Sequence, residues 1–205
     1  MPQQHYFSEQ PSGESKLNDV SFELEGRIFN LKAASGTFSA TKLDTGTRVL
    51  LKESKYFPSQ GDVLDIGCGW GPISLAIAAL RPETNVWGLD VNTRSLETAS
   101  QNAHSLGIGN FRGVLRDEIP ANLNFDAIWS NPPIRIGKSA LHELMEQWLP
   151  RLKPGGSAML VVQKQLGAES FQSWLSERFP DLTVSKHSID KGYRVISVTS
   201  PTRSL

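Results

Sequence analysis

The stretch DVLDIGCGWGPISLAIAAL (residues 62–80) decides the fold of this chain. It predicts a buried strand, a turn with three glycines and an apolar helix. Glycine lets the backbone turn sharply and approach a ligand closely, which side chains at Gly67, Gly69 and Gly71 would hinder. A nucleotide-like ligand is the leading interpretation, although many doubly wound folds have such glycines merely to make the turn. We therefore take the stretch as the start of a doubly wound α/β domain.

The alternation of strand and helix continues toward the end of the chain. Repeated strand, helix and strand predict parallel strands with helices on both faces, because parallel neighbours need a crossover connection. The last two strands are separated only by DKG (residues 190–192), which predicts an antiparallel hairpin on an otherwise parallel sheet. The expected strands are 62–67, 85–91, 110–115, 125–130, 155–163, 182–189 and 193–198, and the expected helices are 71–80, 93–106, 139–152 and 170–179.

The N-terminal part has a different pattern. VSFELEGRIFNLKA (residues 20–33) alternates apolar and polar side chains around Gly26, which predicts a short hairpin with one buried face. Thr41 or Asp44 then has the right chemistry to cap a helix that carries the apolar residues 49–51. We expect this part to cover the main domain.

Length and composition bound the kind of protein. The 205 residues suffice for one buried domain (58–200) with a short arm and cover segment (1–57). The 21 basic and 21 acidic residues balance, which argues against a broad basic surface for nucleic acid but allows a local basic rim. Cys68 is the only cysteine, so neither a disulfide framework nor a cysteine zinc site is expected. With no signal pattern and no apolar stretch longer than 73–80, we expect a cytoplasmic protein without membrane or metal.

Carboxylates near the glycine turn distinguish between ligands. The dinucleotide fingerprint is G-x-G-x-x-G, whereas this turn is G-x-G-x-G with Asp65 two residues before its first glycine. A carboxylate there would oppose a phosphate but suits S-adenosylmethionine, which has a sulfonium and an ammonium group. Asp90 ends the second strand, where a carboxylate can accept both ribose hydroxyls, a feature that fits NAD equally well. Asp117 is placed to accept from an adenine amino group, or it belongs to a solvated loop.

These residues, together with Asn131-Pro132-Pro133 after the fourth strand, resemble the class I S-adenosylmethionine-dependent methyltransferases. Within that class, GTFSATKLDTGTRVLL (residues 36–51) is similar to the signature of the small-domain (MTS) family. That family includes the RsmC-type ribosomal RNA guanine-N2 methyltransferases, and the resemblance covers about residues 20–198. It implies a Rossmann-like, seven-stranded sheet and S-adenosylmethionine as cofactor. The cofactor-binding residues it implies are Asp65, Gly67, Gly69, Gly71, Asp90 and Asp117.

Under this resemblance, SNPPIRIG (residues 130–137) holds the catalytic residues. The exocyclic amine of guanine is a poor nucleophile because its lone pair is delocalised into the ring, so it needs acceptors for its two hydrogens more than a strong base. The carbonyls of Asn131 and Pro132 offer two acceptors, and Pro132 and Pro133 stiffen the backbone between them. A rigid acceptor pair would orient the amine and stabilise the positive charge developing on nitrogen. The alternative is that two prolines simply end a strand.

Ile134 departs from the family pattern. Resembling enzymes usually have an aromatic residue at this position, which stacks on the target base and contributes about 1 to 3 kcal/mol per base. Isoleucine presses on a base face less effectively. Either Phe38 compensates, or surrounding RNA contacts hold the substrate, or the substrate is a different amine. We expect Ile134 and Phe38 to be the substrate-binding residues.

The expected reaction is methyl transfer to guanine N2 of small-subunit ribosomal RNA, by a monomer whose partner is ribosomal RNA or the small subunit. Protein glutamine methylation is an alternative, because a side-chain amide poses the same orientation problem. A catalytically silent module that binds RNA or a ribosomal protein is another. Basic residues near the NPP sequence and the last hairpin form either an RNA-facing rim or a solvated face: Arg135, Lys138, Arg151, Lys153, Lys164, Lys186, Lys191 and Arg194.

Overall fold

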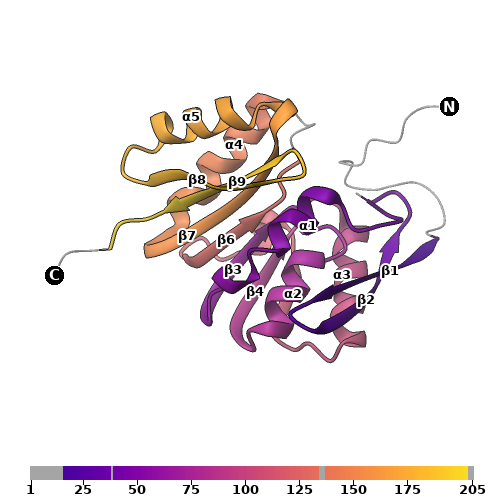
Figure 1. The fold of residues 1–205 in the computed structure, drawn as a ribbon. Helices are drawn as coiled ribbons and strands as arrows, with labels where there is room; N and C mark the ends of the chain where they lie inside the picture. The colour runs from indigo at the N-terminus through magenta and orange to yellow at the C-terminus, as the bar shows by residue number, and fades with distance from the viewer. Residues whose placement is uncertain (1–15, 38, 134–136, 203–205) are drawn as a thin grey trace.

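A computed structural model of the chain describes residues 16–37, 39–133 and 137–202. Its centre is a seven-stranded sheet in the order β5-β4-β3-β6-β7-β9-β8 (Figure 1). The strands from β3 to β7 pair in parallel, whereas β9 is antiparallel to both β7 and β8. The predicted doubly wound, Rossmann-like fold with a C-terminal antiparallel hairpin is confirmed. The strands are β3 (Gln60–Ile66), β4 (Glu83–Leu89), β5 (Phe111–Val114), β6 (Phe125–Ser130), β7 (Leu152–Gln163), β8 (Thr183–Asp190) and β9 (Tyr193–Thr199).

Helices cover both faces of this sheet. Buried side chains of α1, α2 and α3 form one cluster with one face, and those of α4 and α5 form a second cluster with the other. Alternate strand residues enter opposite clusters, with Val63 and Trp129 in the first and Leu64 and Ile128 in the second. The helices are α1 (Thr45–Leu51), α2 (Pro72–Leu80), α3 (Thr93–Ser105), α4 (Lys138–Trp148) and α5 (Ala168–Arg178), with 3-10 turns η1 (Ser54–Tyr56), η2 (Arg116–Glu118), η4 (Leu149–Arg151) and η5 (Lys164–Leu166).

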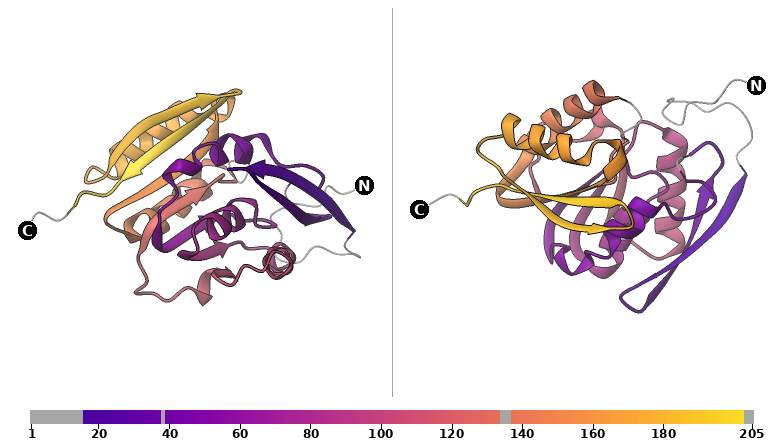
Figure 2. Two further views of the ribbon diagram at one scale, coloured as in Figure 1. Left: turned by 60° about the horizontal axis from the view of Figure 1, so that its bottom comes forward. Right: turned by 45° about the horizontal axis from the view of Figure 1, so that its top comes forward.

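The predicted N-terminal hairpin is formed by β1 (Leu17–Leu24) and β2 (Arg27–Ala34). It is a separate two-stranded sheet, and β2 lies against α3 (Figure 2). Asn102 of α3 bonds both backbone groups of Lys32, since its Oδ1 accepts from the Lys32 nitrogen and its Nδ2 donates to the Lys32 oxygen, each at 2.8 Å. The open edge of β2 is therefore satisfied by a helix side chain.

Different residues begin the helices α1, α2 and α3. Asp44, one of the two expected caps, accepts from the backbone nitrogens of Gly46 and Thr47 at 2.8 and 3.2 Å and so begins α1. Asn92 caps α3 in the same way. In contrast, α2 begins after Gly71, which has φ 92°, with Pro72 at its first position.

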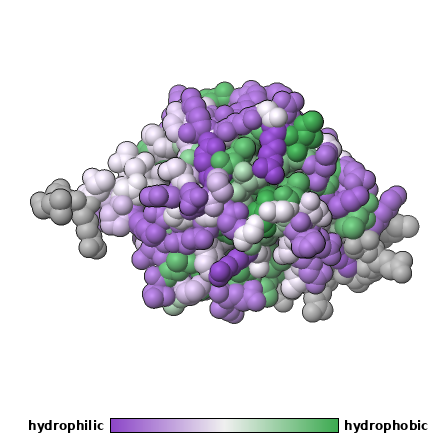
Figure 3. Space-filling view, turned by 90° about the horizontal axis from the view of Figure 1, so that it is seen from below, coloured by the Kyte–Doolittle hydropathy of each residue, from purple (hydrophilic) through white to green (hydrophobic). Residues whose placement is uncertain are grey.

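The cover segment shares the core of the main domain. Phe29 and Leu50 belong to the same buried cluster as Trp129 and Val161 of the large sheet. The apolar core thus includes residues from both sides of position 57. The boundary between the cover segment and the main domain at this position stays a prediction from sequence pattern. Of the described helices, none is long and apolar enough to cross a membrane. Hydrophilic residues predominate on the face seen in Figure 3, where apolar residues occur in separate areas.

Candidate functional site

Strand register places the predicted site residues at one edge of the sheet. Ile66 at the end of β3 pairs with Leu89 of β4 and with Ser130 of β6. The next residue on each strand is Gly67, Asp90 and Asn131, respectively. Three segments distant in sequence are therefore brought together by the ends of parallel strands, which is where doubly wound folds bind their ligands.

The three glycines of the turn serve different purposes. All have positive φ, at 74° for Gly67, 57° for Gly69 and 92° for Gly71. A Cβ at Gly71 would lie 3.0 to 3.2 Å from side-chain atoms of Leu75 and Ala99, so this glycine allows close helix packing. A Cβ at Gly69 would meet no described atom within 4 Å. Open space beside Gly69 is thus available to a ligand.

Asp90 fastens the glycine turn to the end of β4. Its Oδ2 accepts from the Gly69 nitrogen and its Oδ1 from the Asn92 nitrogen, both at 2.9 Å. Burial raises the pKa of the Asp90 carboxyl, and the hydrogen bonds from Asn92 and Gly69 oppose that rise. A carboxylate oxygen has more than one lone pair, so Asp90 retains capacity to accept from a ligand hydroxyl.

Asp65 is fully buried beneath the turn. Its Oδ2 accepts from the Ser74 nitrogen at 2.9 Å and from the Ser74 hydroxyl at 2.5 Å. Its Oδ1 is also buried, and no described residue donates to it. Burial raises the pKa of Asp65 to about 7, the Ser74 hydrogen bonds lower it, and the nearby charge of Asp90 raises it further. An unsatisfied buried acceptor of this kind suits a donor supplied by a ligand.

Asn131 is held by residues of the cover segment. Its Nδ2 donates to Asp44 Oδ2 at 2.8 Å and to Thr47 Oγ1 at 3.1 Å. Both amide hydrogens are therefore used, and this bonding assigns which end of the amide is nitrogen. The sequence identified Asp44 as a helix cap but gave no sign that it contacts Asn131, because such a contact spans 87 positions.

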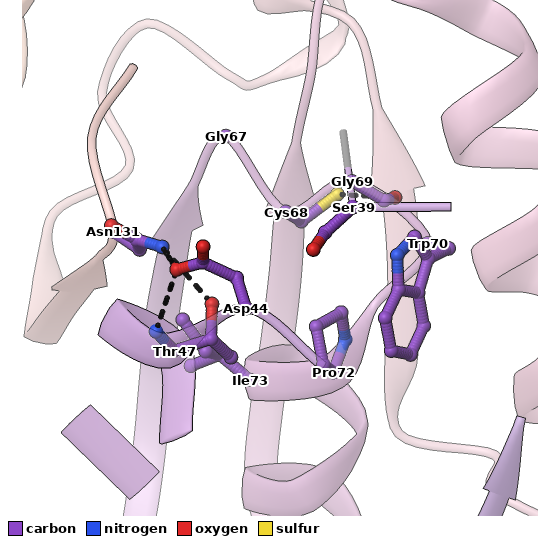
Figure 4. A pocket seen from close by; sticks show the side chains of 10 residues that line it. All are labelled: Ser39, Asp44, Thr47, Gly67, Cys68, Gly69, Trp70, Pro72, Ile73 and Asn131. Atoms are coloured by element: carbon purple, nitrogen blue, oxygen red, sulfur yellow. Dashed lines mark hydrogen bonds between the residues drawn. The ribbon is translucent and has the colours of Figure 1, made fainter. Parts of the chain in front are cut away.

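A pocket lies between the cover segment, the glycine turn and Asn131, and neither Asp65 nor Asp90 is among its lining residues. Figure 4 shows Asn131 on one side with its nitrogen toward Asp44 and Thr47, and Trp70 and Pro72 on the other. Cys68 also lines it but is buried, and burial raises the pKa of its thiol well above the ordinary value. The lining residues are Ser39, Asp44, Thr47, Gly67, Cys68, Gly69, Trp70, Pro72, Ile73 and Asn131.

Other predicted residues lie elsewhere. Asp117 is exposed in η2 and lines a separate depression with Trp148 and Arg151. Pro132 is buried, and Pro133 approaches the turn, with its Cδ 3.7 Å from the position of a Cβ on Gly67. Phe38 and Ile134 lie outside the described residues, so their expected contacts stay predictions.

Several residues of the expected basic rim have internal partners instead. Arg151 donates to the backbone oxygens of Pro120 and Leu123 and lies over the rings of Phe125 and Trp148. Lys153 pairs with Asp126 and Asp62, and Arg194 with Glu169. These three cations have partners within the fold, whereas the sequence left open whether they face RNA or solvent. Arg135 lies outside the described residues.

Comparison with known proteins decides the family. The model of the family described as "Methyltransferase small domain" matches residues 28–197. The chain belongs to this family. The recognition made from the motifs is confirmed, and S-adenosylmethionine is the cofactor that the family uses. Within the described residues, no group of three or more His, Cys, Asp or Glu side chains is arranged to hold a metal ion.

Two relatives of this small-domain methyltransferase differ in length. The uncharacterized protein YbxB of Bacillus subtilis (strain 168) is 35% identical over 196 residues, which cover 94% of this chain and 96% of YbxB. Ribosomal RNA small subunit methyltransferase C of Pseudomonas syringae pv. syringae is 30% identical over 92% of this chain but only 56% of its own length. The chain thus spans about half of such longer relatives.

A solved structure has the same fold. The T. thermophilus 16S rRNA N2 methyltransferase RsmC, in complex with AdoMet and guanosine, superimposes with a TM-score of 0.77 at 22% identity. The match covers 93% of this chain and 52% of that one.

Three features of the described residues fit S-adenosylmethionine. The buried, unsatisfied Oδ1 of Asp65 suits a cationic donor such as an ammonium group. The open space at Gly69 gives a ligand access to the backbone of the turn. Asp90, at the neighbouring strand end, has the chemistry to bind hydroxyls.

Proposed function

We propose that this methyltransferase modifies an exocyclic amine, and specifically N2 of a guanine in small-subunit ribosomal RNA. The observation that carries the proposal is the orientation of Asn131. Because Asp44 and Thr47 accept both hydrogens of its amide, the carbonyl Oδ1 is the group that it offers to a substrate. A carbonyl only accepts hydrogen bonds, so it matches a nucleophilic nitrogen that still bears hydrogens.

Each side chain then has a defined task. Asp65 would accept from the ammonium end of the cofactor and Asp90 from its ribose hydroxyls, whereas Asp117 lines a separate depression and is given no contact. S-adenosylmethionine supplies an electrophilic methyl group bonded to a positively charged sulfur. The carbonyls of Asn131 and Pro132 accept the two amine hydrogens and so aim the nitrogen.

The same carbonyls compensate the charge that the reaction creates on nitrogen. As the bond from nitrogen to the methyl carbon forms, the carbon–sulfur bond breaks and its electron pair stays on sulfur. The nitrogen becomes positive until one of its protons leaves to water. Fixed carbonyl dipoles favour that charged transition state without having to reorient during the reaction.

The relatives favour RNA as the substrate. RsmC-type relatives carry names that assign them to small-subunit ribosomal RNA, and the structural neighbour is named an N2 methyltransferase. Because the chain spans only about half of these proteins, their full substrate contacts do not transfer directly. We propose that Phe38 and Ile134 contact the base and that the remaining basic rim, including Lys138 and Lys164, contacts phosphates.

Protein glutamine is the second candidate substrate. A side-chain amide nitrogen also bears two hydrogens, so it satisfies the same requirement that Asn131 imposes. A silent binding module is distinguished from both enzymes by calorimetric titration with S-adenosylmethionine, since absence of binding at cellular cofactor concentrations would contradict any methyl transfer.

Transfer of labelled methyl tests the substrate directly. Small subunits, free ribosomal RNA and total protein from a strain lacking this chain serve as three acceptors for the purified enzyme. We expect label in small subunits or their RNA, recovered as N2-methylguanine after digestion. Label only in protein, recovered as methylglutamine, would replace the RNA proposal with the second candidate.

A further inference from the structure

Asp44 of the cover segment makes one more hydrogen bond, to Asn131, than it needs to cap α1. One oxygen of Asp44 accepts from the backbone nitrogens of Gly46 and Thr47 and also from Asn131 Nδ2. The first two bonds cap α1, and a serine or asparagine would make such bonds as well. The third bond serves Asn131 alone. A carboxylate oxygen is suited to three donors because it is negatively charged.

The next residues of the same motif fit Asn131 closely. A Cβ on Gly46 would lie 2.9 Å from Tyr193 Cε1, 3.0 Å from Asp44 Oδ2 and 3.1 Å from Asn131 Oδ1. Only glycine lets α1 approach Asn131 to this distance without displacing one of them. Thr47 is buried and its hydroxyl accepts the second amide hydrogen at 3.1 Å. Asp44, Gly46 and Thr47 therefore form one cradle around the amide.

The segment that carries this cradle is itself held at its other end. Beyond α1, Glu53 accepts from Ser188 Oγ at 2.6 Å and lies 3.1 Å from His187 Nε2, both on β8. Lys52 pairs with Asp190 at the end of the same strand. Because α1 is fixed both to β8 and to the loop after β6, its position relative to Asn131 is set by the large sheet.

We propose that Asp44 and Thr47 are positioning residues for the reaction, which hold the Asn131 amide with its carbonyl toward the amine. The inference rests on the proposed function of Asn131 as the acceptor. Without the cradle the amide is free to rotate by 180° and present its NH2 group, which repels a substrate donor. Loss of a fixed dipole in an active site typically lowers the rate by about 100-fold or more.

Two substitutions separate positioning from folding. Asp44→Ser retains a side chain that caps α1 but is too short to reach Asn131 as well. Thr47→Val removes the acceptor and keeps the shape. Thr45→Val, at an exposed position of the same helix, is the matched control. We expect Asp44→Ser and Thr47→Val to lower kcat about 10- to 100-fold with unchanged affinity for S-adenosylmethionine, and Thr45→Val to match the wild type.

Each substitution is repeated in an Asn131→Ala background. If Asp44 and Thr47 act through Asn131, they have no further effect on kcat there. Wild-type kcat in either single variant would overturn the inference, and so would an equal fold-loss in the two backgrounds.

A second measurement needs no substrate. The NMR signals of the Asn131 side-chain amide, assigned by their loss in Asn131→Ala, should show slow hydrogen exchange in the wild type and faster exchange in both cradle variants. Unchanged exchange would contradict the cradle. If the wild type methylates none of the three acceptors, the proposed function fails, and the NMR comparison still decides whether the cradle orients the amide.

Discussion

Individual residues at the strand ends offer separate groups for the proposed cofactor binding and the proposed chemistry. Asp65 and Asp90 lie on β3 and directly after β4, on the proposed cofactor side, whereas Asn131 follows β6 and has its own partners in the cover segment. Within the described residues, Asn131 donates to Asp44 and Thr47, whereas Asp90 accepts from Gly69 and Asp65 from Ser74. Substitutions can therefore separate cofactor binding from methyl transfer.

If Asp65 binds the ammonium group as proposed, cofactor binding should depend on pH. Burial raises its pKa to about 7, so the protonated form dominates below that pH and cannot pair with an ammonium group. We expect affinity for S-adenosylmethionine to be about tenfold lower at pH 6 than in the fully ionised protein. Calorimetry between pH 6 and 8 measures this, and Asp65→Asn should remove the dependence. If the affinity of Asp65→Asn changed with pH as much as that of the wild type, the pH dependence would belong to another group.

The same group affects stability in the opposite sense to most carboxylates. Since its folded pKa lies above the ordinary value of 3.8, the folded chain holds a proton that the unfolded chain releases. The contribution of Asp65 to the free energy of unfolding therefore falls as pH rises from about 4 to about 7. Urea unfolding of the wild type and of Asp65→Asn across this range should show this contribution as the difference between their slopes, because other shifted carboxylates such as Asp90 titrate in both proteins.

Asp90 has two roles that substitution should reveal together. Asp90→Ala removes the proposed ribose acceptor, worth about 1 to 3 kcal/mol of cofactor affinity, and also leaves the Gly69 and Asn92 nitrogens without their acceptor. We expect both weaker cofactor binding and a lower melting temperature without ligand. Asp90→Asn, which keeps one oxygen, should recover part of the stability. An unchanged affinity of Asp90→Ala for S-adenosylmethionine would show that Asp90 does not bind the ribose.

At the scale of elements, Asn102 connects the N-terminal hairpin to the glycine turn. Besides bonding both backbone groups of Lys32, its Nδ2 donates to the backbone oxygen of Trp70 at 3.0 Å. The same buried side chain thus touches α3, β2 and the turn that lines the pocket. A shift of the β1–β2 hairpin is consequently expected to change the shape of the glycine turn.

Asn102→Ala should loosen that link. Loss of three buried hydrogen bonds is expected to lower the free energy of unfolding by about 2 to 4 kcal/mol and to speed amide exchange in both β2 and residues 67–71. The matched control is Asn110→Ala, whose side chain also donates to three backbone oxygens, those of Ala78, Arg81 and Thr84, none of which belongs to the hairpin. Hydrogen exchange with mass spectrometry compares the two. Equal exchange patterns would mean that Asn102 has only a general stabilising effect.

Elements were predictable from sequence where their signal is local. Each of these signals lies within a few residues: the apolar runs of the strands, the glycine turn and the DKG hairpin. The sequence pattern therefore predicted the order of strands and helices along the chain and the antiparallel hairpin at its end. The cradle did not, because Asp44 and Asn131 are 87 positions apart and meet only once the sheet register is set. Charge in the sequence also gave no sign of the partners of Arg151 and Arg194, which are backbone oxygens and a carboxylate that folding brings close.

At the scale of the whole molecule, the cover segment and the main domain should unfold together. Phe29, Leu31 and Leu50 share one buried cluster with Trp129 and Val161, so neither part has a complete core alone. We expect a single urea transition, with coincident midpoints from tryptophan fluorescence and far-ultraviolet circular dichroism. Two separated transitions would show that residues 1–57 form an independent unit.

The contact between Asn131 and Asp44 also bears on the order in which parts of the chain are expected to fold. The proposed cofactor contacts lie between Asp65 and Asp90, so they arise from one short length of chain once β3 and β4 pair. The orientation of Asn131 requires that β6 joins the sheet and that Asp44 and Asn131, 87 positions apart, come together. Closing this long loop costs more chain entropy than pairing β3 with β4, so we expect the contact to form more slowly. We therefore expect the amide of Asn131 to reach its final orientation late in folding, when the shared core is complete, so that methyl transfer depends on completion of the whole fold.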